Sequence, residues 1–425
     1  MTLHAERDIV RYRQEREEFF HRHGHRWPNT LADAFDILEP YSLERREVDE
    51  IRQTAGRLAV IYQRAGALLR KASDQTLFEL GVPEYLWRSV RQEIFGMPDC
   101  VLGRFDLART RSGYRMLEFN SDNPGFVVEA FSLNSAVCHE AGAPDPNHGC
   151  EAALRQALHR AVSAGLAHVG KSELDGNRAN VVVTCSQNFG RDITSATYLC
   201  ALLQPLPARR FPVEALQLDS RGLYDPGGRK IDVLVRGYSL KFIRNELFAR
   251  REELLEAEMG GELLRLVETR QLALINPPAA FLLGNKAVQA AIWNLAERGL
   301  LFDDQEQQWV KHYMLPTYMD APGDGAGYVI KPVHGAEGDT LTVVGAGGEV
   351  VLKSPNSTYS DEPMIYQQYV ELPQQSLMTE YGPRHLHLVM SCFVVEGSPS
   401  AIFMRAGEAI TDETAWVVPL CSLAG

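Results

Sequence analysis

The sequence has no apolar run of the roughly 18 residues that a membrane-spanning helix needs. Its seven cysteines are dispersed without a C-x-x-C pair, which argues against a disulfide framework and is typical of free thiols in a reducing cytoplasm. The opening residues lack the apolar stretch of a secretory signal. A net charge of −12 argues against a general nucleic-acid binder. We therefore expect a cytoplasmic protein without membrane or nucleic-acid partners.

At 425 residues the chain is long enough for about two or three domains with ample cores. The first 95 residues have the apolar periodicity of helices, and Pro83 is expected to open the last of these helices, through Leu86, Val90 and Ile94. Further on, residues 180–184 and 231–238 are predicted to be buried strands. The first of these strands is followed by a loop and a helix, as in half of a Rossmann-like unit, although no G-x-G-x-x-G motif is present.

Two short predicted strands, residues 101–106 and 114–120, carry the strongest functional signal. The segment between them is polar and contains a glycine, so the spacing predicts a β-hairpin. A turn centred on residues 111–113 fixes which residues of the two strands lie opposite each other.

This register gathers four polar side chains on one face of the hairpin. Arg104 would lie opposite Asn120, and Asp106 opposite Glu118. Adjacent carboxylates repel unless something neutralises them, and such oxygen ligands suit Mg²⁺, which usually binds one or two carboxylates together with substrate phosphates. The alternative is an ion-paired hairpin face in contact with solvent.

Two lysines occur later in contexts that suit phosphate binding. Lys331 ends an apolar strand and precedes a glycine-rich loop, residues 333–338, whose N–H groups could cover phosphates. Lys286 opens a helix-like run, although a surface position is the commoner place for either lysine alone. An apolar strand at residues 363–371 follows, and a further strand delivers Arg405.

In this order the pieces resemble the ATP-grasp synthetase of the glutathionylspermidine synthase family. The resemblance implies an α/β protein with a circularly permuted ATP-grasp fold, in which metal ligands precede the nucleotide-binding lysines, together with an N-terminal helical segment and a Rossmann-like subdomain. It covers about residues 95–420 and rests on Arg104, Asp106, Glu118, Asn120, Asp122, Pro124 and Glu129, then on Asn285-Lys286, Lys331-Pro332 with the following glycines, Ile365 to Tyr369, and Arg405.

The resemblance also implies a division of the chain. The expected domains are residues 1–95, an N-terminal helical segment; residues 96–175, the metal-binding hairpin and helices of the ATP-grasp core; residues 176–270, the Rossmann-like substrate subdomain; and residues 271–425, the nucleotide-binding and lid region.

Site roles follow from the resemblance residue by residue. Asp106, Glu118 and Asn120 would hold Mg²⁺. Arg104 and Arg405 would be the catalytic residues, stabilising the transferred phosphate or the acyl phosphate. ATP would be bound by Lys286, Lys331, Gly335, Gly338, Gln367, Gln368, Tyr369 and Val370, the last four forming an adenine hinge.

The implied reaction is ATP-dependent amide formation between a small carboxylate, free or borne on a carrier protein, and an amine. An acyl phosphate forms, ADP and phosphate leave, and related ligases suggest a homodimer. The chain departs from the family in its loop, which reads His334-Gly-Ala-Glu-Gly338 where Gly-Arg is common, and in residues 123–126, where small hydroxyl residues are usual. No cysteine precedes Cys100, so no amidase activity is expected. Kinase-like phosphoryl transfer and nucleotide binding without turnover are the alternatives.

Overall fold

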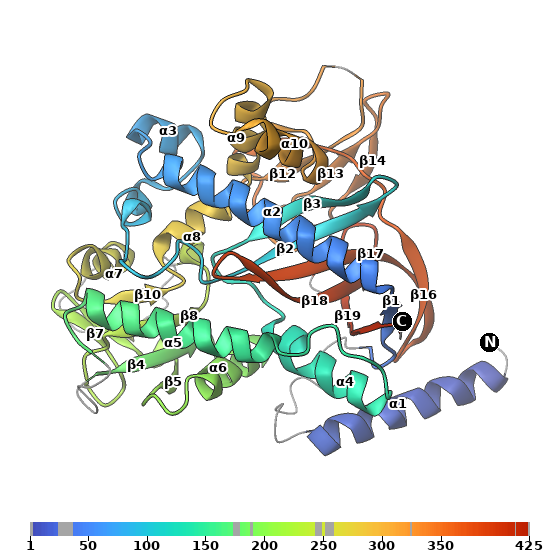
Figure 1. Ribbon diagram of the computed structural model, residues 1–425, viewed down its shortest axis with the longest axis horizontal. Helices are drawn as coiled ribbons and strands as arrows, with labels where there is room; N and C mark the ends of the chain where they lie inside the picture. The colour runs from blue at the N-terminus through green and yellow to red at the C-terminus, as the bar shows by residue number, and fades with distance from the viewer. Residues whose placement is uncertain are drawn as a thin grey trace.

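The computed structural model describes residues 3–23, 37–172, 179–187, 190–242, 249–250, 259–323, 325–412 and 414–423. Helices and strands are mixed along the chain, which confirms the predicted α/β class (Figure 1). All seven cysteines are free, as expected. Among the described residues, no helix is both long and apolar enough to span a bilayer.

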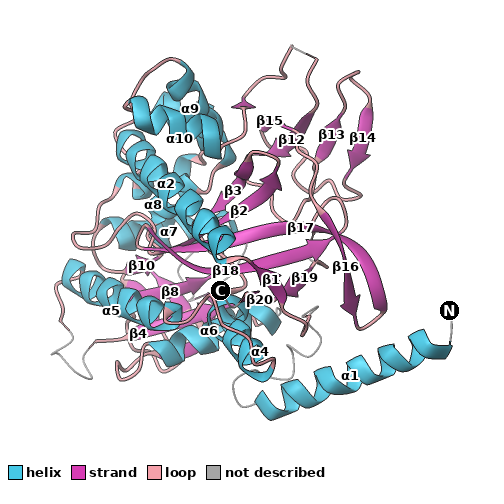
Figure 2. Ribbon diagram, turned by 45° about the vertical axis from the view of Figure 1, so that its right-hand side comes forward, coloured by secondary structure: helices cyan, strands magenta, loops and turns pink. Residues whose placement is uncertain are grey.

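A six-stranded antiparallel sheet lies at the centre of the molecule (Figure 2). Its order is β19-β18-β17-β2-β3, and β16 pairs with β17 outside this path. The predicted hairpin forms its β2–β3 edge, so residues far apart in the sequence meet the hairpin through β17. The strands are β2 (Leu102–Thr110), β3 (Gly113–Asn120), β16 (Gln374–Thr379), β17 (Gly382–Val395), β18 (Ser398–Gly407) and β19 (Trp416–Val418).

The long helix α2 (Arg45–Leu69) packs against this sheet. Its N-terminus is closed by a capping box, in which Glu44 and Glu47 satisfy each other's backbone N–H groups. Its apolar stripe is buried, and the ring of Tyr62 meets the stacked pair Phe105 and Phe119 of the hairpin. Burial of this stripe holds one face of the hairpin against the helix, and the charged side chains described below lie on its opposite face.

A second antiparallel sheet of five strands has the order β11-β15-β12-β13-β14. The helix α9 (Lys286–Glu297) begins as predicted, because the side chain of Asn285 accepts a hydrogen bond from the N–H of Ala287 at 2.7 Å. The other elements here are α8 (Pro278–Leu283), α10 (Asp304–Tyr313), β11 (Thr317–Tyr318), β12 (Tyr328–Pro332), β13 (Thr342–Val344), β14 (Val350–Lys353) and β15 (Met364–Gln368).

A four-stranded parallel sheet, in the order β10-β8-β4-β5, lies beside the central sheet. The strands β4, β8 and β10 are mainly apolar and buried, as expected for a parallel sheet covered by helices, whereas the edge strand β5 is polar and only partly buried. The helix α5 approaches it closely at Gly165, where a Cβ would lie 3.1 Å from Ala273. The elements are α5 (Cys150–His168), β4 (Val181–Cys185), α6 (Gly190–Leu202), β5 (Arg209–Pro212), β8 (Val233–Gly237), η7 (Leu240–Phe242), α7 (Met259–Glu268) and β10 (Ala273–Ile275).

The remaining elements frame these sheets. Figure 1 shows α1 along the lower edge of the molecule, next to α4. Two small sheets, β1-β20 and β7-β6-β9, complete the strand pairing among the described residues. The bounds are α1 (Leu3–His23), β1 (Tyr41–Leu43), α3 (Asp74–Glu79), η4 (Glu129–Leu133), α4 (Asn134–Glu140), η6 (Val213–Ala215), β6 (Gln217–Asp219), β7 (Gly222–Tyr224), β9 (Ala249–Arg250) and β20 (Leu420–Ser422).

The prediction of a helix after Pro83 is wrong. The segment instead forms two separate 3-10 turns, η2 (Glu84–Leu86) and η3 (Ser89–Arg91). These turns contact α7, and η3 also packs on α8. Leu86 and Val90 are still fully buried, so tertiary packing satisfies the apolar positions without a continuous helix.

The packing of α2 predicts a contrast between neighbouring positions. Leu58 is 1% exposed, whereas Val60 on the same helix is 38% exposed. Replacing Leu58 by Ala should lower the free energy of unfolding by about 2–5 kcal/mol through lost burial and a residual cavity. Val60→Ala should stay within about 0.5 kcal/mol of the wild type. Urea denaturation followed by circular dichroism measures both, and equal losses would contradict the placement of this helix.

Candidate active site

The charged face of the hairpin has the predicted register. Arg104 pairs with Asn120 and Asp106 with Glu118 across β2 and β3, with an irregularity directly after Asp106. The guanidinium of Arg104 binds Asp106 through both carboxylate oxygens, Nε to Oδ1 at 2.7 Å and Nη2 to Oδ2 at 2.9 Å. The Asn120 amide donates to Asp106 and to Glu118, at 3.1 Å each. Since Arg104 is 5% and Asp106 1% exposed, a solvated ion-paired face is excluded.

The central sheet brings two further groups to the same carboxylate. Ser391 on β17 lies opposite Asp106, and its hydroxyl donates to Oδ1 at 2.8 Å. Arg405 on β18 donates from Nη2 to Oδ2 at 2.7 Å, which places this predicted residue in the cluster. Local sequence carried no signal for Ser391, because its position depends on pairing between distant strands.

The two predicted lysines reach the cluster from the other side. The Lys286 ammonium lies 3.3 Å from Glu118 Oε2 and donates to the carbonyl of Gly335 at 2.6 Å. Lys331 donates to the Gln367 side chain at 2.7 Å and to the carbonyl of Leu117 at 3.4 Å. Gln367 therefore positions Lys331 from within the fold.

Electrostatics in this cluster favour anions. Burial alone would raise the pKa of Glu118, but Lys286, Lys331 and Arg405 outweigh it and hold that pKa well below its usual range. Burial lowers the pKa of Lys331 to about 8. With Arg104, the cations outnumber the two carboxylates, so the cluster carries an excess of positive charge that suits a polyanion.

A cavity of about 140 Å³ is lined by Asp106, Glu118, Lys286, Lys331 and Arg405, and Arg104 is joined to this lining through Asp106. The rest of its lining is mixed: apolar side chains come from β12, β13 and the segment after β15, and the loop after β12 adds Glu337 and Asp339. The predicted hinge lies at this edge, although the N–H groups of Gln368 and Tyr369 already bind the carbonyls of Pro316 and Gly327. The residues that line the cavity include Asp106, Glu118, Lys286, Val329, Lys331, Gly335, Glu337, Gly338, Asp339, Val343, Gln367, Gln368, Tyr369, Val370 and Arg405.

The loop between β12 and β13 needs both predicted glycines. A Cβ at Gly335 would lie 2.2 Å from Pro332 Cγ. Gly338 has a φ of 68°, and a Cβ there would lie 2.5 Å from the Ile410 side chain. Larger side chains at these two positions would therefore prevent the loop from adopting this conformation at the cavity.

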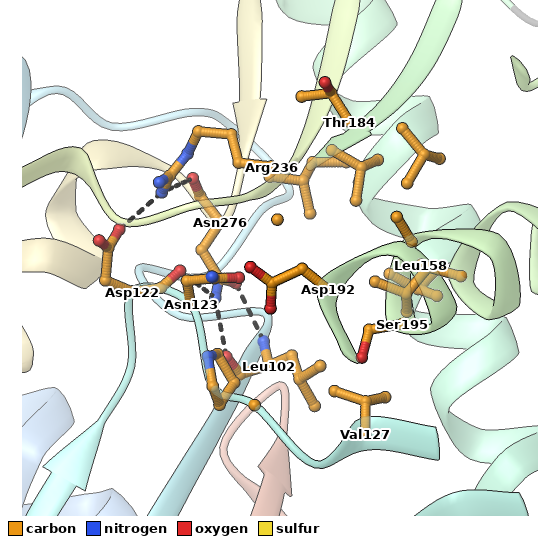
Figure 3. Close-up of a pocket in the computed structure, with 18 residues that line it drawn as sticks. Leu102, Asp122, Asn123, Val127, Leu158, Thr184, Asp192, Ser195, Arg236 and Asn276 are labelled. Atoms are coloured by element: carbon orange, nitrogen blue, oxygen red, sulfur yellow. Dashed lines mark hydrogen bonds and ion pairs between the residues drawn. The ribbon is translucent and has the colours of Figure 1, made fainter. Parts of the chain in front are cut away.

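A second cavity, of about 50 Å³, lies at the carboxyl ends of β4, β8 and β10 (Figure 3). Asp122 and Arg236 on its wall form an ion pair at 2.7 Å, and Arg236 also donates to the carbonyl of Asn276. Asp192 faces the cavity, and burial raises the pKa of this carboxyl group to about 6. Gly125 joins the two sites, since it lines this cavity and its carbonyl accepts a hydrogen bond from Arg104 at 3.0 Å. Asp122 was among the residues that carry the family resemblance, whereas nothing in the sequence indicated that Asp192 belongs to a site.

The predicted metal ligands fit Mg²⁺ in kind. Asp106, however, already accepts five hydrogen bonds, more than the roughly four lone-pair directions of a carboxylate. Glu118 and Asn120 are therefore the residues best placed to hold Mg²⁺, while Asp106 stays a predicted ligand. Across the described ranges, no three His, Cys, Asp or Glu side chains gather into a metal-binding group.

Comparison with known proteins then settles the family. The family model described as glutathionylspermidine synthase preATP-grasp matches residues 7–422. The chain belongs to this family. A Haemophilus influenzae protein named as an acid–amine ligase is 22% identical over 368 residues, which cover 82% of this chain and 81% of that protein.

Solved structures of low sequence identity are also similar. A glutathione synthetase-like effector from Globodera pallida, in its apo form, has a TM-score of 0.52 at 13% identity and covers 91% of this chain and 89% of its own. A Methylobacillus flagellatus protein named as a gamma-glutamylcysteine synthetase has a TM-score of 0.41 at 11% identity and covers 86% of each chain. The first similarity supports a glutathione synthetase-like, ATP-grasp-related fold for this family member.

The lowered pKa of Lys331 predicts a pH dependence of anion binding. Lysine is cationic below its pKa, so the empty protein loses this charge as pH rises through about 8. Affinity for metal-free ADP should therefore be constant near pH 7 and fall by up to about tenfold per pH unit above pH 8. In Lys331→Arg the dependence should be lost, because arginine stays protonated. Calorimetric titrations from about pH 7 to about 9.5 test this, and equal slopes for both proteins would refute it.

Proposed function

We propose that this protein is an ATP-dependent carboxylate–amine ligase that forms an amide through an acyl phosphate. The observation that carries the proposal is that Arg405, Lys286 and Lys331 line one partly apolar cavity, to which Arg104 is joined through Asp106. An apolar cavity with a cationic end suits the base and polyphosphate of a nucleotide. Family membership and the relative named as an acid–amine ligase support the ligase class.

In this proposal the fold is an ATP-grasp in circularly permuted order, with the parallel sheet as its Rossmann-like subdomain. The order of the site supports it, because the hairpin carboxylates precede Lys286 and Lys331 in the chain. The division at about residues 95, 175 and 270 is part of the same proposal.

The first chemical step is transfer of the γ-phosphoryl group of ATP to a substrate carboxylate. Lys286 and Lys331 would bind the phosphates, and Arg104 and Arg405 would stabilise the charge on the transferred group. Asp106 holds both guanidiniums, so they are oriented before substrate binds and little reorganisation is needed. Mg²⁺ held by Glu118 and Asn120 would add neutralisation of the phosphate oxygens.

The second step is attack of the amine nitrogen on the acyl carbon. A C–N bond forms, the C–O bond to phosphate breaks, and the electron pair leaves with phosphate. An ammonium substrate releases two protons overall, one of which phosphate can keep. The second cavity, which Gly125 connects to Arg104, is the proposed site of a substrate. The Asp192 carboxylate there, with its pKa raised by burial to about 6, can accept the other proton.

A single substitution tests the role of the hairpin carboxylate. Glu118→Gln keeps the shape of the side chain but removes its negative charge, which faces Lys286 and would bind Mg²⁺. Turnover should fall about 100-fold or more while the fold is retained. Glu349→Gln, an exposed position on the loop before β14, should leave turnover unchanged. Steady-state ADP release measures both variants, and full activity in Glu118→Gln would remove the basis for the assignment.

The reaction class is tested by incubating the protein with Mg-ATP and pooled carboxylates, with and without pooled amines. ADP release that needs both pools, with a product mass of acid plus amine minus water, would support a ligase and identify its substrates. A stable phosphorylated product from one pool would instead indicate a kinase. ATP binding without turnover in any pool, carrier-borne acids included, would indicate a non-catalytic binder.

A further inference from the structure

The loop that covers the nucleotide cavity has an unfavourable charge for its proposed ligand. Residues 333–341 include Glu337 and Asp339 but no lysine or arginine. Both acids line the cavity whose other end suits phosphates. A loop with two negative charges repels a polyphosphate, so other elements must supply the cations that hold it closed.

Lys286 supplies one such contact through the carbonyl of Gly335. A second lysine, Lys241, reaches the loop from the side of the parallel sheet. Its ammonium donates to the carbonyl of His334 at 3.2 Å and to the Tyr359 hydroxyl at 3.0 Å. It also lies 4.7 Å from the centre of the Tyr359 ring.

The surroundings of Lys241 are both buried and acidic. Burial lowers the pKa of Lys241, whereas Glu362, Glu337, Asp122 and Glu118 act to raise it. The ammonium therefore lies within electrostatic reach of the loop acid Glu337 and of Glu118 at the charged end of the cavity. A cation placed there offsets negative charge that the phosphates would otherwise meet.

The same lysine is tied to the second cavity. It belongs to the short turn η7, and the N–H of the preceding Leu240 donates to Asp122 Oδ2 at 2.8 Å. The other oxygen of Asp122 binds Arg236. Asp122 and Arg236 both line the second cavity, so one hydrogen-bonded chain runs from its wall through η7 to the loop over the first.

We propose that Lys241 is a positioning residue of the nucleotide site, which supplies the cation that the covering loop lacks and fixes this loop relative to the Asp122–Arg236 pair. This rests on the proposed binding of ATP in the first cavity. Lys241 acts through the loop and is not among the residues that line the cavity. Its loss should therefore weaken nucleotide binding and loosen the loop, with less effect on the residues that contact the phosphates.

The test compares Lys241→Met, which keeps an unbranched stem without the charge, with Lys241→Arg. Calorimetry should give a Kd for Mg-ATP about tenfold weaker for Lys241→Met, and a Kd near the wild-type value for Lys241→Arg. Hydrogen exchange of residues 334–338 should slow in the wild type when Mg-AMPPNP binds, and slow less in Lys241→Met. The matched control is Lys230→Met, since Lys230 also donates to a backbone carbonyl, that of Arg221, but outside both cavities.

The fold should survive these changes, because the loop is also anchored by the His334 ring, which stacks on Phe281 and contacts the carbonyl of Gly81. Tyr359→Phe, which removes only one acceptor of the lysine, provides a milder second variant that should also loosen the loop. Wild-type affinity and wild-type loop protection in Lys241→Met would overturn the inference. A wild-type protein that does not bind Mg-ATP would overturn the proposed function and this inference together.

Discussion

The buried carboxylate of Asp106 is the interaction on which the candidate site depends. Its two oxygens accept hydrogen bonds from Arg104 on its own strand, Asn120 on β3, Ser391 on β17 and Arg405 on β18. A buried charge without partners is very unfavourable, so the strands of the central sheet and the charged centre constrain each other. The same contacts hold two guanidiniums in place before any substrate arrives.

This arrangement explains why the site is cationic although the protein has a net charge of −12. Asp106 is shared between Arg104 and Arg405, and Glu118 is shared between Lys286 and Lys331, so each carboxylate neutralises less charge than faces it. The remaining positive charge is concentrated at one end of a cavity, where low polarity strengthens its field. Net charge therefore says little about this site, because its local balance has the opposite sign.

The sequence predicted well what short-range geometry decides. The register of Arg104 with Asn120 follows from strand alternation and a tight turn, and the start of α9 at Lys286 follows from the Asn285 cap. Ser391 could not be predicted, because it meets Asp106 across 285 residues of chain through strand pairing. The turns after Pro83 were missed for a related reason, since contacts with α7 and α8 decide their conformation.

The role proposed for Lys241 likewise could not be predicted from the local sequence. Nothing in the apolar strand before it marks this lysine, because its role depends on a contact with His334, 93 residues later in the chain. The fold sets two cavities that are connected through Gly125, Arg104 and Asp106, one with excess cations and one with the buried carboxyl group of Asp192. In the proposed reaction, the cations would stabilise the phosphoryl group while a nearby carboxylate accepts a proton from the attacking nitrogen. The two cavities are also coupled, because Glu337 of the first acts on Asp192 of the second and a hydrogen-bonded connection runs between them through η7.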